Sequence, residues 1–121
     1  MSLDVRLVVG PCDDTPCVQC GMRGEHQLYT ANITHNLNKM AAAADLYTVL
    51  WRADELWDTP VAAHLISLLE QGLTALRNDP ASYASHAPVN GWGTYEGLVA
   101  FVEVYLAACR EFPSARVTVS R

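Results

Sequence analysis

The sequence predicts an α+β domain in which a small three-stranded sheet is covered on one face by about three helices, in the order β-β-α-α-α-β. Two segments near the N-terminus and one at the C-terminus alternate apolar and polar residues, as half-buried strands do. The long middle part instead repeats apolar residues at the spacing of helices. All of these elements fit into a single domain over residues 1–121, which is long enough to build its own core.

Three segments have the period of two that is typical of strands. The first covers residues 3–9, where every odd position is apolar. The second covers residues 27–33, and its odd positions from Tyr29 onward form the apolar face. The third covers residues 115–120. The order of these strands in the sheet is left open by the sequence.

Two helices are expected directly after the second strand. Residues 37–51 carry apolar side chains at the spacing of one continuous helical face. Residues 61–76 form a second apolar stripe, which Asp58 or Thr59 can cap and for which Pro60 suits the first turn. We therefore expect two amphipathic helices that cover the sheet.

The third helix is expected to begin near Thr94 and to end before Pro113. Glu96 lies in its first turn, where the helix dipole favours an acidic side chain. Cys109 is expected to be a small buried hydrophobic residue of its apolar stripe. A short extra helical turn is predicted over residues 80–86.

The acidic composition restricts the class of partner. The chain has 13 acidic and 8 basic side chains, for a net charge of −5. This balance argues against duplex nucleic acid and against an anionic membrane surface, because both bind mainly through basic residues. The sequence also lacks a long apolar run and the pattern of a signal peptide, so we expect a cytoplasmic protein.

The Cys-rich loop at residues 10–26 has the most unusual composition of the chain. Its C-x2-C-G turn can direct two thiolates at one ion, and a structural zinc ion needs four such ligands. The predicted ligands are Cys12, Cys17, Cys20 and His26. His35 is an alternative fourth ligand, and unliganded thiols or a redox-active Cys17/Cys20 pair are the alternatives to zinc.

Two predicted helix starts, residues 32–36 and 90–95, are rich in hydrogen-bonding side chains. Helix N-termini expose unpaired N–H groups, so two of them facing one cleft would attract a polar or anionic ligand. The alternative is that these residues only cap helices and form turns. The candidate ligand-binding residues are Asn32, Thr34, His35, Asn36, Asn90, Trp92, Thr94 and Tyr95.

Four segments carry a resemblance to other proteins: residues 31–40 (ANITHNLNKM), 50–52 (LWR), 90–99 (NGWGTYEGLV) and 117–121 (VTVSR). From Tyr29 onward the chain resembles a group of small uncharacterised proteins encoded by bacteriophages, prophages and some bacteria. The group has no known activity and is not associated with the cysteines of this chain. The resemblance implies a phage-related accessory role, in the host cell cytoplasm if the protein is phage-encoded.

Together these features favour a non-enzymatic binding module, a phage-related accessory or host-interaction protein that binds a small polar or anionic ligand or a protein. No familiar catalytic motif occurs in the sequence. One alternative is a small hydrolase or transferase with His35 as acid or base. Another is a zinc-stabilised structural or oligomeric protein. The sequence leaves the ligand and the oligomeric state open.

Overall fold

Three strands form one antiparallel sheet in the order β2-β1-β3. The computed structural model describes residues 2–9, 26–86 and 93–120. The strands are β1 (Ser2–Val9), β2 (His26–Thr34) and β3 (Arg116–Ser120). The strand nearest the N-terminus therefore lies in the middle and pairs with both others. The predicted third strand is confirmed and returns to the sheet beside the first.

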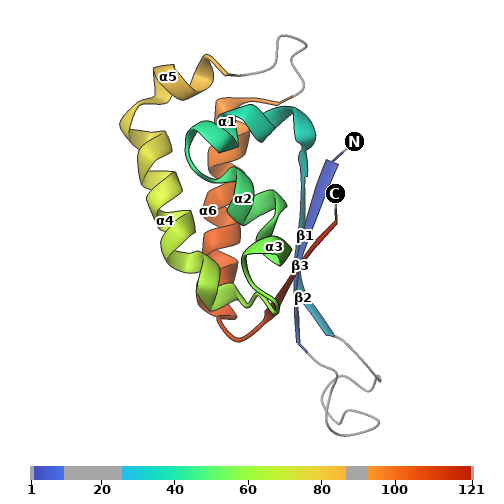
Figure 1. Cartoon of the computed structure of the whole chain (residues 1–121). Coiled ribbons are helices and arrows are strands. Elements are labelled where there is room, and N and C mark those ends of the chain that lie inside the picture. The colour runs from blue at the N-terminus through green and yellow to red at the C-terminus, as the bar shows by residue number, and fades with distance from the viewer. Residues whose placement is uncertain (1, 10–25, 87–92, 121) are drawn as a thin grey trace, which may run out of the picture.

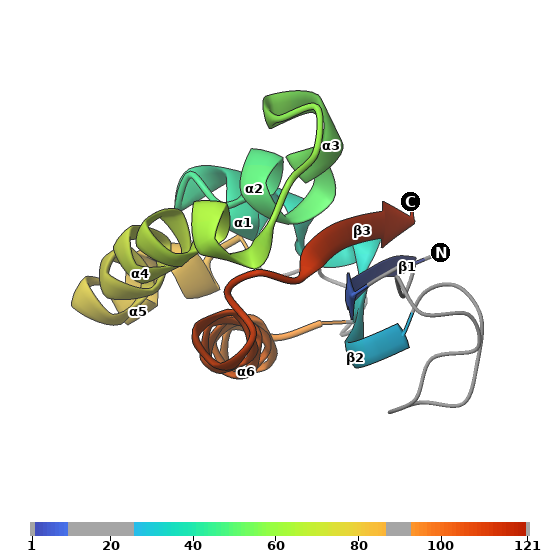
Figure 2. The ribbon, with the colours of Figure 1, turned by 90° about the horizontal axis from the view of Figure 1, so that it is seen from below.

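The helices of the described residues lie on one face of this sheet (Figures 1 and 2). They are a 3-10 turn (His35–Leu37), α1 (Asn38–Ala43), α2 (Tyr47–Trp51), α3 (Ala53–Leu56), α4 (Ala62–Asn78), α5 (Pro80–Ala84) and α6 (Tyr95–Glu111). The α+β class and the order of strands and helices along the chain are confirmed. The helical region is divided into more segments than predicted.

The core lies between the sheet and the helices. In β1 the side chains of Leu3, Val5 and Leu7 are fully buried, as the alternation predicts. The register with β2 shifts after Leu7, because Leu7 pairs with Tyr29 whereas Val8 pairs with Gln27, which leaves Leu28 as the extra residue of a β-bulge in β2. Val8, an even position of β1, lies on the opposite face of the sheet and is buried outside the main core cluster.

The predicted continuous helix over residues 37–51 is wrong. It is divided between α1 and α2, where Asp45 adopts a φ of 59° that no α-helix accommodates. The division rotates the second part of the segment, so that Leu46 is fully buried while Thr48, which the continuous stripe assigns to the core, is exposed. A second division follows at Arg52, with a φ of −133°.

The predicted cap of the long middle helix is also wrong. The N-cap of α4 is Val61, and neither Asp58 nor Thr59 caps it. The residues before α4 are instead bound to the sheet, because the Pro60 carbonyl accepts a hydrogen bond of 2.8 Å from the Val117 amide. Val61 itself forms an isolated bridge with β3. Tertiary pairing therefore fixes the start of α4, and the polar residues in front of it have no capping role.

The predicted boundaries of the last helix are confirmed, and the extra turn predicted over residues 80–86 is present as α5, Pro80–Ala84. The Thr94 hydroxyl oxygen caps α6 by accepting a hydrogen bond of 2.9 Å from the Gly97 amide. The helix ends at Glu111, two residues before Pro113, and buries Cys109 as predicted. Burial raises the pKa of the Cys109 thiol to about 12, so this thiol stays protonated and unreactive at neutral pH.

Tyr105 of α6 is fully buried beside Tyr29 and Phe101, and its hydroxyl group has no hydrogen-bond partner among the residues that the structure describes. A buried hydroxyl without a partner costs about 1–3 kcal/mol. Tyr105→Phe removes the hydroxyl and keeps the ring, so we expect it to raise the free energy of unfolding by about 1 kcal/mol, measured by urea denaturation.

Tyr95→Phe is the matched control for this change. The Tyr95 hydroxyl donates a hydrogen bond of 2.7 Å to the Leu76 carbonyl, so the same substitution should lower the free energy of unfolding by about 1 kcal/mol. A loss of stability in both variants would contradict the prediction for Tyr105.

Candidate functional site

The face of the sheet opposite the helices carries mostly polar side chains. Paired residues of an antiparallel ladder point to the same face, so the strand register places these side chains in three rows. The rows are Asn32, Asp4 and Ser120; then Thr30, Arg6 and Thr118; then Gln27, Val8 and Arg116. These nine residues are called the polar sheet face below.

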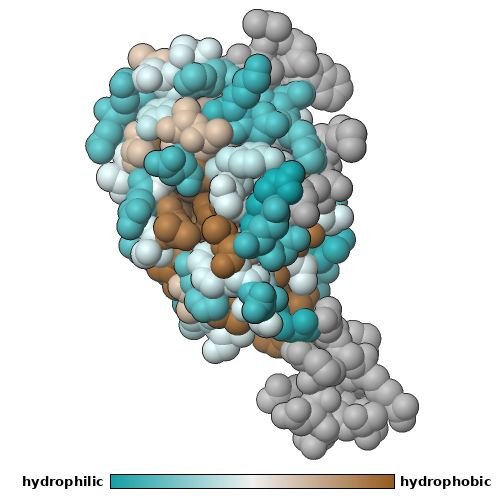
Figure 3. Space-filling view, in the orientation of Figure 1, coloured by the Kyte–Doolittle hydropathy of each residue, from teal (hydrophilic) through white to brown (hydrophobic). Residues whose placement is uncertain are grey.

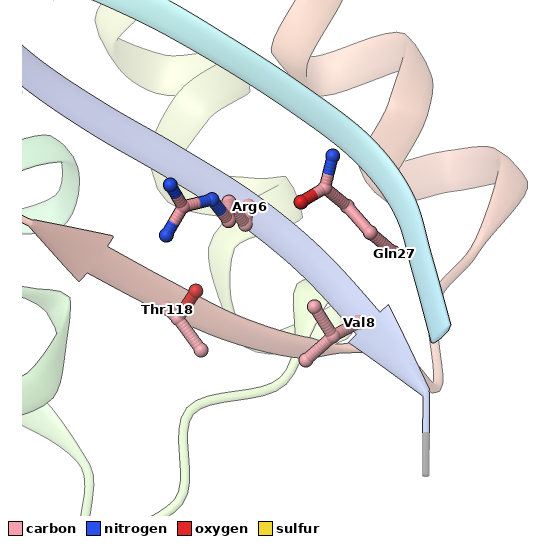
Figure 4. A pocket seen from close by; sticks show the side chains of 4 residues that line it. All are labelled: Arg6, Val8, Gln27 and Thr118. Atoms are coloured by element: carbon pink, nitrogen blue, oxygen red, sulfur yellow. The ribbon is translucent and has the colours of Figure 1, made fainter. Parts of the chain in front are cut away.

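Arg6 stands at the centre of the polar sheet face, between the paired residues Thr30 and Thr118. A hollow of about 440 Å³ opens here, lined by Arg6, Val8, Gln27 and Thr118. Figure 4 shows these four side chains on the three strands, with the guanidinium group of Arg6 and the amide of Gln27 on neighbouring strands. The hollow therefore combines a cation, an amide and a hydroxyl group over an apolar floor.

The charge of Arg6 is not neutralised by any described residue. Three other arginines form ion pairs: Arg52 with Glu55 at 2.6 Å, Arg77 with Glu103, and Arg110 with Glu70. Within the described ranges, the side chain of Arg6 makes no hydrogen bond or ion pair, and it is exposed. The acid nearest to it along β1 is Asp4, whose carboxylate accepts a hydrogen bond of 2.8 Å from the side-chain amide of Asn32.

The two polar helix starts that the sequence singles out are neighbours in the fold. Gly93 adopts a φ of +129°, and a Cβ built on it would lie 2.9 Å from Leu37 Cγ and 3.1 Å from Thr34 Cγ2. The backbone that enters α6 thus packs directly against the 3-10 turn after β2. Asn90 and Trp92, the other candidates of this region, lie outside the described residues.

Most of the predicted ligand-binding side chains that the structure describes are used by the fold itself. Asn32, Thr34, Thr94 and Tyr95 all take part in hydrogen bonds with other groups of the chain. The Tyr95 hydroxyl is directed at α4, and the Thr34 hydroxyl accepts from the Asn36 amide at 3.3 Å. The bonds of Thr34 and Thr94 are helix caps, whereas those of Asn32 and Tyr95 join separate elements. His35 and the Asn36 side chain are left as ligand candidates.

His35 packs edge-on against Trp51, with ring centroids 6.2 Å apart and an interplanar angle of 73°. Its Nε2 atom is buried and has no hydrogen-bond partner within the described ranges. In the part of the chain that the structure describes, no titratable group is hydrogen-bonded to this ring. General acid or base catalysis needs such a partner or a substrate proton within reach, so the hydrolase or transferase hypothesis gains no support here.

The predicted zinc ligands Cys12, Cys17 and Cys20 lie outside the described residues, and of His26 only the backbone is described. Among the residues that are described, no cluster of His, Cys, Asp or Glu has the arrangement of a metal site. His26 and His35 lie at opposite ends of β2, about 30 Å apart at 3.3 Å per residue, so they cannot bind the same ion.

The zinc site stays a prediction that metal analysis can test. We expect protein purified without added zinc to contain about one equivalent, since a closed four-ligand site binds the ion tightly. His26→Ala should lower the zinc content, whereas His35→Ala should not if His26 is the fourth ligand. A wild-type content below about a tenth of an equivalent would contradict the prediction.

The sequence pattern alone did not identify Arg6 and its neighbours as a site. The available signal was the polar residue at each even position of the first half of β1, which by itself indicates only a solvated strand face.

No helix in the described ranges has the length and apolarity needed to cross a membrane. Comparison of the chain with protein-family models, curated proteins and solved structures finds no match.

Proposed function

We propose that the protein is a non-enzymatic binding module whose polar sheet face receives an acidic group of a partner protein. The observation that carries this proposal is Arg6, an exposed cation in a hollow that forms no ion pair with the described residues, within a chain of net charge −5. The hydroxyl groups of Thr30 and Thr118 flank it, so a carboxylate placed there gains additional donors.

The shape of the site favours a protein partner over a small molecule. Pockets for small ligands bury most of the ligand surface between several walls. The hollow at Arg6 is instead formed by side chains of a single sheet face, with Val8 as its apolar lining residue. An open polar hollow with one central cation suits an acidic side chain that is held in place by contacts on either side.

The proposal can be tested with a defined acidic probe. In ¹⁵N NMR titrations at low salt, a glutamate-rich peptide should shift the signals of the Arg6 side chain and of the Gln27 and Thr118 amides. Arg6→Gln should weaken binding about two- to fivefold, because one exposed charge pair is worth about 0.2–1 kcal/mol. Added salt should weaken the wild-type binding as well.

Lys39→Gln is the matched control, because Lys39 is an exposed cation of α1 and forms no ion pair with described residues. It removes the same unit of charge and should leave the affinity within about twofold of wild type. Equal weakening by both substitutions would show attraction by net charge alone and contradict the site. Equal shifts with inorganic phosphate would indicate a small-anion site in place of a protein surface.

The phage-related accessory role implied by the resemblance is compatible with this proposal, since accessory proteins commonly act by binding. A host protein with an acidic surface segment is the kind of partner that the polar sheet face would fit. The corner around His35 and Asn36 remains a second candidate surface, supported by the close approach of Gly93 to Thr34.

A further inference from the structure

The sheet has two edges, and the described residues cover only one of them. At the outer side of β3, the segment before α4 supplies the bridge from Val61 to Arg116 and the hydrogen bond from Val117 to the Pro60 carbonyl. At the outer side of β2, no strand or bridge from the described ranges is paired. Within the described ranges, β2 is therefore the edge strand to which another strand can be added.

The sequence of β2 lacks the features by which proteins protect an exposed edge. Residues 27–34 contain no charged side chain and no proline, in a chain of which 17% of the residues are charged. The bulge at Leu28 limits regular pairing to the part that begins at Tyr29. That part is six residues long and has the β-propensity and the neutrality of a strand that pairs edge to edge.

We infer that this edge pairs with β2 of a second copy of the chain, antiparallel across a two-fold axis near Ala31. In this register Tyr29 lies opposite the partner's Ile33, and Thr30 lies opposite the partner's Asn32. Apolar side chains then meet on the helix side of the sheet and polar side chains meet on the other side, so each side chain keeps the face that it has in the single copy. A two-fold axis requires such self-complementarity, and two chains of net charge −5 can meet with least repulsion along an uncharged strand.

An independent observation on α6 supports the same interface. α6 packs against β2 through Tyr105, which stacks on Tyr29 at 6.0 Å. Leu106 and Arg110 line the side of α6 that faces α4, so Val104 points to the opposite side. Val104 is 55% exposed, although it is a large hydrophobic residue.

Figure 2 shows β2 at the margin of the sheet and α6 on the same side of the molecule. A two-fold axis perpendicular to the sheet keeps the helices of both copies on one face, so the two α6 helices approach each other beside the β2 seam. The side of α6 around Val104 also carries the exposed, uncharged Gly97 and Ala100, and the exposed Glu111 follows on this side at the end of the helix. The dimer would thus bury the exposed Val104 together with the outer edge of β2, and it does not depend on the proposed role of Arg6.

Sedimentation velocity over a range of protein concentrations tests this interface. The wild-type chain should pass from the 13.2 kDa monomer to twice that mass as its concentration rises. Val104→Glu introduces a pair of like charges at the seam and should weaken the dimer about tenfold or more. Leu56→Glu is the matched control: Leu56 is 44% exposed on α3, and its replacement should leave dimerisation unchanged.

Hydrogen exchange supplies the second readout, because it reports on the edge itself. Amides of residues 29–34 should become better protected at high concentration in the wild type and in Leu56→Glu, but less so in Val104→Glu. Circular dichroism establishes that each variant is folded. A wild-type chain that stays monomeric to about 1 mM would overturn the inference. The inference would also be overturned if Val104→Glu dimerised as tightly as the wild type, or if dimerisation did not slow hydrogen exchange at the amides of β2.

Discussion

Gly72→Ala is expected to lower the free energy of unfolding by about 2 kcal/mol or more, although alanine is the better helix former. Gly72 lies on the buried side of α4, and a Cβ built on it would lie 2.3 Å from Leu46 Cδ2 and 2.4 Å from Leu46 Cγ. Leu46 is itself fully buried, so its side chain cannot move into solvent to make room. In a chain of this length the change should lower the melting temperature by about 10 °C.

Gly97→Ala is the control for the helix propensity of alanine. Gly97 is exposed in the first turn of α6, where the atom nearest to an added Cβ is Thr94 Oγ1 at 3.1 Å. We expect the free energy of unfolding of this variant to stay within about 0.5 kcal/mol of wild type.

Gly72→Ala combined with Leu46→Ala should lower the free energy of unfolding by at least about 1 kcal/mol less than the sum of the single changes, because the cavity left by the Leu46 side chain accepts the new methyl group. Strict additivity would show that the two residues do not compete for space.

Gly93→Ala is expected to lower the free energy of unfolding by about 2–3 kcal/mol, for two reasons. The φ of +129° at Gly93 is a conformation that residues with a Cβ rarely adopt. The added Cβ would also lie within 3.0 Å of the Leu37 Cδ2 atom. Chemical denaturation measures the loss, and hydrogen exchange should increase most in the first turn of α6 and in the 3-10 turn that Gly93 contacts.

The contribution of the contact can be separated from that of the backbone strain. Leu37→Ala removes the side chain that the new methyl group would meet but leaves the backbone of Gly93 unchanged. If the contact with Leu37 causes most of the loss, Gly93→Ala should lower the free energy of unfolding by less in the Leu37→Ala background than in the wild type. If backbone strain causes most of it, the losses of the two single variants should add in the double variant. A Gly93→Ala variant as stable as wild type would contradict both causes.

Much of the fold followed from local patterns in the sequence. The alternation at Leu3, Val5 and Leu7 placed the first strand and its buried face correctly, because the side-chain period of a strand does not depend on its neighbours. Thr94 marked the start of α6 for the same reason, since a cap acts on amides within its own turn.

Features that depend on distant partners could not be predicted in this way. The division at Asp45 lets Leu46 reach Gly72, which is a packing relation between residues far apart in the sequence. The cap of α4 was missed because the preceding residues pair with β3. The site at Arg6 is defined by its neighbours on two other strands, and those neighbours follow only from the strand order β2-β1-β3.

The central position of β1 also has a consequence for how the domain assembles. The ladder between β1 and β3 joins Asp4 to Ser120, so it closes a loop that contains nearly the whole sequence. The β1–β2 hairpin and the helices involve shorter separations and can form earlier, whereas closure of such a long loop carries the larger entropic cost. We therefore expect the sheet to be completed late in folding, and until then β1 exposes a free edge on the side that β3 will occupy.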